Sequence, residues 1–120
     1  MRAALLYTLL VLMVAAFQAG LALGMPWGAL AMGGAFPGAY PPRMRVAAGA
    51  AVVIVLALAW VVRRAAGGAG WAQRGVWGVV ALMALGLALN LASPSRPERA
   101  LWSPVVAVML AAALSVARRA

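Results

Sequence analysis

The chain has 120 residues, of which 68% are hydrophobic and only 9% are charged, and its mean hydropathy is +1.03. This composition excludes an ordinary soluble globular domain and indicates an integral membrane protein with a single domain, residues 1–120. The net charge of +9 comes from ten arginines and one glutamate. The arginines flank apolar runs, so we expect them to meet lipid headgroups and expect no nucleic acid partner. The lack of cysteine and histidine excludes disulfides and an ordinary zinc site, and we expect no cofactor.

The first apolar run covers residues 3–24 and carries no charge. As a helix it would extend about 33 Å, at ~1.5 Å per residue, which is enough to cross a bilayer. A cleaved signal peptide is the alternative interpretation, because Arg2 precedes the run and small residues follow at 16–20. The apolar run continues past those small residues, which favours a membrane span.

Three further runs, each bracketed by arginine, cover about residues 46–62, 76–92 and 96–117. We therefore predict an all-α fold: an integral membrane four-helix bundle with up-down-up-down topology. In this topology both termini and the second loop share one side of the membrane. That side holds six of the arginines, whereas the other side holds four and the glutamate. The positive-inside rule then predicts cytoplasmic termini in a bacterial inner (plasma) membrane.

Small residues recur at intervals of four within three of the runs. Such spacing places them on one stripe of a helix, where small side chains let membrane helices approach closely. The stripes consist of Ala16, Gly20 and Gly24, of Gly78, Leu82, Gly86 and Asn90, and of Ala107, Ala111 and Ser115. We expect these stripes to form contacts within the bundle, with one left over for a homo-oligomer.

The segment MPWGALAMGGAFPGAYPPRMR, residues 25–45, connects the first two runs. Its prolines and glycines exclude a continuous helix, yet it is apolar as far as Arg43. Irregular backbone at membrane depth must be covered by protein or water, so we predict that this segment folds back onto the mouth of the bundle. A simple lid and a binding element are both open interpretations of it.

Glu98, the only acidic residue, lies in NLASPSRPERALWSP, residues 90–104. Ser95 and Glu98 have the Ser-x-x-Glu spacing of a capping box, in which each side chain accepts a hydrogen bond from an amide at the start of a helix. This pattern predicts that the fourth helix begins near Arg96, and it gives Glu98 a structural role.

Polar residues near the two outer loops suggest a binding site. Gln18 and Asn90 are expected at similar depths, where such residues either mark function or hydrogen-bond to neighbouring helices. We predict an outward-facing pocket beneath the first loop, with arginines that offer forked donors to a phosphate or carboxylate, such as a lipid headgroup. The candidate ligand-binding residues are Gln18, Trp27, Arg43, Arg45, Asn90, Arg96, Glu98 and Arg99.

Three segments, PWGALAMGG at 26–34, PPRMRVA at 41–47 and NLASPSRPERALWSP at 90–104, resemble a group of small uncharacterised bacterial membrane proteins with four spans. The resemblance implies a four-helix fold with two outer loops, and it brings no activity with it. The positions that match its motifs are Trp27, Gly28, Gly33, Gly34, Asn90, Ser95, Glu98 and Arg99.

No nucleophile and base occur at a spacing typical of catalysis, so we expect no enzymatic activity. We expect a small membrane protein that binds a lipid headgroup or a protein partner at its extracytoplasmic face. A small-solute transporter or channel that acts as a homo-oligomer is the alternative.

Overall fold

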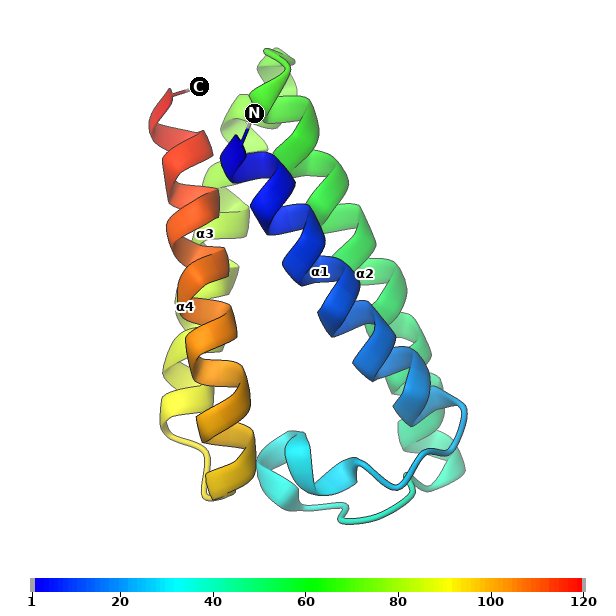
Figure 1. The fold of residues 1–120 in the computed structure, drawn as a ribbon. Helices are drawn as coiled ribbons and strands as arrows, with labels where there is room; N and C mark the ends of the chain where they lie inside the picture. Colours follow the sequence, from blue (N-terminus) through cyan, green and yellow to red (C-terminus); the bar gives the residue numbers. More distant parts are fainter. Residues whose placement is uncertain (1, 120) are drawn as a thin grey trace.

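A computed structural model describes residues 2–119 and contains four α-helices and two short 3-10 helices (Figure 1). The α-helices are α1 (Arg2–Ala22), α2 (Pro42–Ala66), α3 (Gly70–Leu91) and α4 (Arg96–Arg119). The 3-10 helices, η1 (Gly28–Leu30) and η2 (Met32–Gly34), lie in the segment between α1 and α2. The predicted all-α four-helix bundle is confirmed, and its helices run alternately up and down.

Each of the four α-helices is long and apolar enough to cross a membrane, which is the construction of a multi-pass membrane protein. The second helix is longer than the predicted span, because it includes Arg43 and Arg45 at its start and Arg63 and Arg64 at its end. Pro42 suits the first turn, where its missing N–H leaves no partner unpaired. Arginines at helix ends extend toward headgroups without interrupting the helix, so the apolar run alone underestimates the helix.

The bundle consists of two antiparallel hairpins, because α1 packs along α2 and α3 packs along α4. The hairpins meet at the end that holds both termini and the α2–α3 turn, which we call the termini end (Figure 1). They separate at the opposite end, which we call the loop end. The segment 23–41, which we call the loop, bridges the two hairpins there.

The main hydrophobic core lies toward the termini end and joins all four helices. Tyr7, Val11, Val62, Val76 and Ala113 are completely buried in it. Elsewhere the helices leave long apolar side chains exposed on their outer faces, where lipid would cover them. The core therefore closes one end of the bundle and leaves the other to be filled by the loop.

The predicted stripes of small residues are largely wrong as contacts within the bundle. Ala16 and Ala111 are exposed, Leu82 is 49% exposed, and a Cβ added to Gly78 would meet open space. On α4 the buried face is offset from the predicted stripe and includes Met109, Ala112, Ala113 and Val116. A four-residue spacing defines a stripe without saying which way it faces, and that direction is decided by the pairing of the hairpins.

Candidate functional site

The loop is held in shape by close backbone packing. The amide of Gly28 donates a hydrogen bond of 2.8 Å to the carbonyl of Gly38, which closes the loop on itself. A side chain at position 28 would overlap the carbonyl oxygen of Phe36, so only glycine fits there. The loop is therefore a packed structure of its own and not a random connection.

Three hydrogen bonds dock the loop onto the first turns of α4. The Ser95 hydroxyl donates to the Ala29 carbonyl (2.7 Å), and the Trp102 indole N–H donates to the Leu30 carbonyl (2.9 Å). Between them the Gly33 amide donates to Oε2 of Glu98 (2.8 Å). Ser95 directly precedes α4, and positions 95, 98 and 102 lie on one side of its first turns, so this side satisfies three polar backbone groups of the loop.

The predicted capping box forms only in part. The Glu98 amide donates to the Ser95 hydroxyl at 3.3 Å, as the pattern requires. The carboxylate does not return to the Ser95 amide, which donates to the Ser93 hydroxyl at 3.2 Å instead. Because the loop offers the Gly33 amide, the carboxylate half of the predicted capping box does not form, and Glu98 connects two segments far apart in the sequence.

Aromatic rings hold the loop against α1. The Trp27 ring stacks on Phe17, with centroids 5.9 Å apart and planes at 12°. Phe17 also meets Trp102 of α4 edge to face, with centroids 4.7 Å apart. The Trp27 ring lies over Gly20, where any Cβ would overlap it, so Gly20 serves the loop and not a helix–helix stripe.

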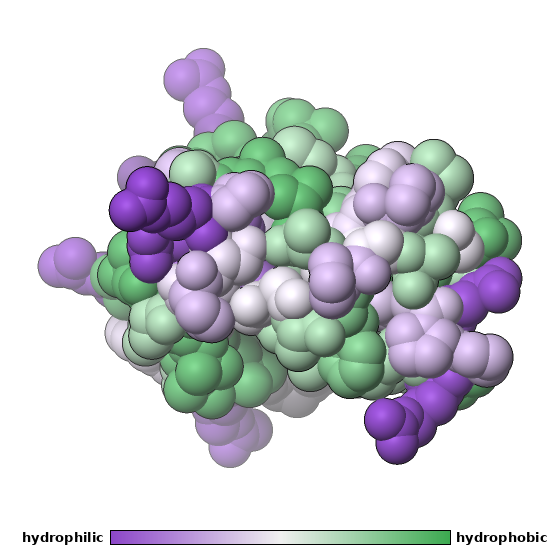
Figure 2. All heavy atoms as spheres, turned by 90° about the horizontal axis from the view of Figure 1, so that it is seen from below, coloured by the Kyte–Doolittle hydropathy of each residue, from purple (hydrophilic) through white to green (hydrophobic). Residues whose placement is uncertain are grey.

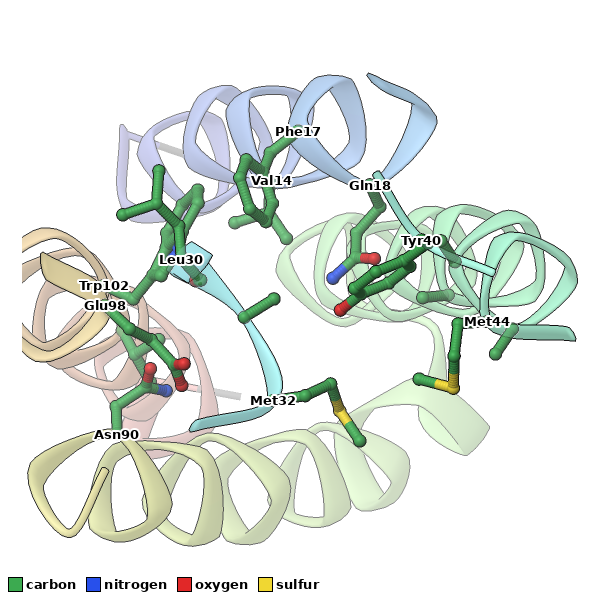
Figure 3. A pocket seen from close by; sticks show the side chains of 15 residues that line it. Val14, Phe17, Gln18, Leu30, Met32, Tyr40, Met44, Asn90, Glu98 and Trp102 are labelled. Atoms are coloured by element: carbon green, nitrogen blue, oxygen red, sulfur yellow. The ribbon is translucent and has the colours of Figure 1, made fainter. Parts of the chain in front are cut away.

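A cavity of about 280 Å³ lies between the hairpins beneath the loop (Figure 3). All four helices and the loop contribute to its wall, which is mostly apolar. Its lining residues are Val14, Phe17, Gln18, Leu30, Ala31, Met32, Tyr40, Met44, Ala47, Ala48, Ala51, Asn90, Glu98, Trp102 and Val106. Pockets for small molecules have this character: a concave apolar wall with a few polar groups.

Polar groups face the cavity from two sides. On one side the Gln18 carboxamide and the Tyr40 hydroxyl point toward the same part of the space, and on the other Asn90 and Glu98 lie next to each other (Figure 3). The Asn90 amide donates to the Gly86 carbonyl of its own helix at 2.7 Å, so its oxygen is the end left for other partners. Burial raises the pKa of the Tyr40 phenol, and the negative charge of Glu98 raises that pKa further.

The four loop-end arginines do not line the cavity. Arg45 donates to the Ala22 carbonyl at the end of α1 (2.9 Å), and Arg99 donates to the Ser93 carbonyl (2.9 Å). Arg43 and Arg96 are exposed. Viewed from the loop end, hydrophilic groups lie toward the edges of the molecule, and its middle is pale to hydrophobic (Figure 2).

The structure thus divides the predicted site residues into two groups. Gln18, Asn90 and Glu98 meet at the cavity, while the arginines stay outside it and Trp27 anchors the loop. Sequence reasoning did not identify Tyr40 and Trp102 as lining residues. The available signal was their position in the sequence, since Tyr40 precedes Pro41 and Trp102 follows Glu98 by one helical turn. That position does not specify whether either side chain points into the bundle.

Comparison of the chain with family models, with curated proteins and with solved structures finds no match.

Proposed function

We propose that this protein binds an amphipathic molecule, with membrane lipids as the first candidates, in the cavity at its loop end, and that it does so without catalysis. The observation that carries the proposal is the cavity itself, of about 280 Å³, held open between two hairpins. Apolar side chains form most of its wall, and a few polar groups converge on it. That combination favours a ligand with an apolar body and one polar end.

The packing at the termini end supports binding of a ligand rather than its transport through the protein. Directly beyond the cavity the bundle is closed by completely buried side chains, among them Tyr7, Val11 and Val76. A transported solute would need a path through this core. The cavity therefore resembles a binding pocket that ends at the core.

We place the loop end on the extracytoplasmic side of a bacterial inner membrane, with both termini in the cytoplasm. The support is the distribution of arginine, which is denser at the termini end. Exposed Arg43 and Arg96 would then meet the phosphates of the outer leaflet, while the cavity receives the rest of the ligand. Labelling of single cysteines from the two sides of the membrane tests this orientation.

The proposal is tested by native mass spectrometry of the full-length protein released from its own membrane. Ala51 lines the cavity, whereas its neighbour Ala50 is exposed on the outer face of α2. Ala51→Phe fills the space, and Ala50→Phe adds the same bulk outside it. We expect a bound lipid or other small molecule in wild type and in Ala50→Phe, and its loss in Ala51→Phe. Bare protein in all three samples, or equal retention in both variants, would overturn the proposal.

A further inference from the structure

We infer that the cavity selects a positively charged amphiphile, in which an ammonium group is attached to an apolar body. The inference rests on the proposed binding function and adds the chemical class of the ligand. It starts from the charge of the wall: Glu98 is the only charged residue among the lining residues. In a chain of net charge +9, the cavity thus presents a negative charge and no positive one.

Glu98 has unused capacity to accept a partner. Glu98 is buried, with only 8% of the residue exposed. Within residues 2–119 the carboxylate accepts one hydrogen bond, from Gly33 to Oε2, and no arginine pairs with it. A carboxylate offers about four acceptor positions, so docking of the loop leaves most of them available. A buried carboxylate without a counter-charge is unfavourable, and a ligand cation would supply that charge.

The remaining lining residues suit an ammonium group in the same way. The rings of Phe17, Tyr40 and Trp102 carry negative π-faces that attract cations. Met32 and Met44 add flexible, polarisable thioethers, which adapt to irregular apolar groups. The oxygen of Asn90 is left free by its N–H bond to Gly86 and is a further acceptor for an ammonium group. The only charge on the wall is the negative charge of Glu98, which disfavours an anion.

The exposed arginines at the loop end disfavour small, fully hydrated cations as ligands. A small, fully hydrated cation approaching from water would be repelled by Arg43, Arg45 and Arg96. A molecule with an apolar body can concentrate in the bilayer, and so does not depend on that route. Two sources provide this chemistry: a zwitterionic lipid such as phosphatidylethanolamine, whose phosphate would face the arginines, and a free lipophilic amine.

The test compares two probes of equal shape and different charge: benzyltrimethylammonium and its carbon isostere neopentylbenzene. The full-length protein is placed in nanodiscs of phosphatidylglycerol, a lipid without an ammonium group, and binding is measured by ligand-observed NMR. We expect the cation to bind wild type at least about tenfold more tightly than the isostere, since a cation–π contact and a charge pair each contribute on that scale. Glu98→Gln keeps an acceptor for Gly33 and removes the charge, so it should abolish the preference.

Two variants distinguish a failure of the cation preference from a failure of the proposed binding function. Ser95→Ala weakens the docking of the loop without changing the charge of the cavity, and it should keep the preference for the cation. Ala51→Phe should weaken both probes. Equal binding of both probes to wild type, with both lost in Ala51→Phe, would overturn the cation preference and leave the binding function intact. No binding of either probe, together with no lipid retained from the native membrane, would overturn the binding function itself.

A second arm distinguishes the sources. Nanodiscs that mix phosphatidylethanolamine with phosphatidylglycerol are analysed by native mass spectrometry of the released protein. Preferential retention of phosphatidylethanolamine, lost in Glu98→Gln, would support the lipid as the source. Binding of the probe cation without such retention would support a free amine. Preferential retention of phosphatidylglycerol in wild type would contradict the inference.

Discussion

Tyr40 links the loop to the charge of the cavity at the scale of a single residue. Its phenol is buried at 6% exposure, and burial first, then Glu98, raises its pKa above the ordinary value of 10.0. The folded protein therefore keeps the phenol proton at pH values where the unfolded chain has lost it. Its contribution to stability is complete below about pH 10 and falls as the pH rises through the folded-state pKa.

An absorbance titration at 295 nm checks this pH dependence. The chain has two tyrosines, so Tyr7→Phe leaves Tyr40 as the only phenol. We expect the midpoint of its ionisation to lie above the ordinary value of 10.0 and the loop to loosen as the phenol ionises. Adding Glu98→Gln should lower the pKa only in part, because burial is the larger cause. An ordinary tyrosine titration in the Tyr7→Phe protein would contradict the buried position of Tyr40.

The same scale shows how far the sequence predicts the site. The contact between the Ser95 hydroxyl and the Glu98 amide was predictable, since its two partners are three residues apart. The bond from Glu98 to Gly33 joins residues 65 positions apart, and no local pattern encodes it. Local chemistry thus located the important glutamate, whereas its partner depends on where the fold brings the loop.

Gly20 and Trp27 decide, at the scale of elements, whether the loop can dock on α1. Gly20→Ala would place a methyl group inside the Trp27 ring, and the ring would have to leave its stack on Phe17. We expect the free energy of unfolding in detergent to fall by about 1–3 kcal/mol, as for other overpacked sites. The tryptophan emission maximum of the variant should lie at a longer wavelength than that of wild type, because the loop becomes more exposed to solvent.

Gly49→Ala provides the matched control for this change. Gly49 lies within α2, and a Cβ added there would meet nothing within 4 Å. Alanine favours a helix, so this variant should be neutral or more stable by up to about 1 kcal/mol. Similar losses in both variants would show that Trp27 does not depend on the missing side chain at position 20.

Helices and loop differ in how well the sequence predicts them. The helices follow from long apolar runs, and only their ends were misjudged, as at Arg43 and Arg64. The prolines and glycines between 25 and 42 predicted an irregular loop folded back on the bundle. Its two 3-10 turns and its docking face on α4 were not predictable, because they depend on tertiary hydrogen bonds to Ser95 and Trp102.

The orientation of the whole molecule can be tested because the chain contains no cysteine. We expect Ala35→Cys, in the loop, to react with a membrane-impermeant maleimide added to intact cells. As a control, Ala69→Cys places a thiol in the α2–α3 turn. Ala69→Cys should react only after the membrane is opened. The reverse pattern of labelling would place the loop end in the cytoplasm.

The separation of the two hairpins is a property of the whole molecule that hydropathy could not reveal. Four apolar runs predict four helices and their alternation, and both predictions agree with the structure. The volume of the loop lies between the two hairpins at one end of the molecule, and the cavity lies beneath it. That volume depends on how the loop folds, which the pattern of apolar residues does not encode.

The docking of the loop also fixes an order of events during synthesis. Its three hydrogen-bond partners on α4 follow it in the chain by 65 to 72 residues. When α1, the loop and α2 have been made, the surface that will receive the loop has not yet been made. The newly made protein must hold an apolar, unpaired segment at the membrane surface until its last helix arrives. A chain whose synthesis stops before α4 would therefore keep an undocked loop, and its exposed apolar surface would make it prone to aggregation and degradation.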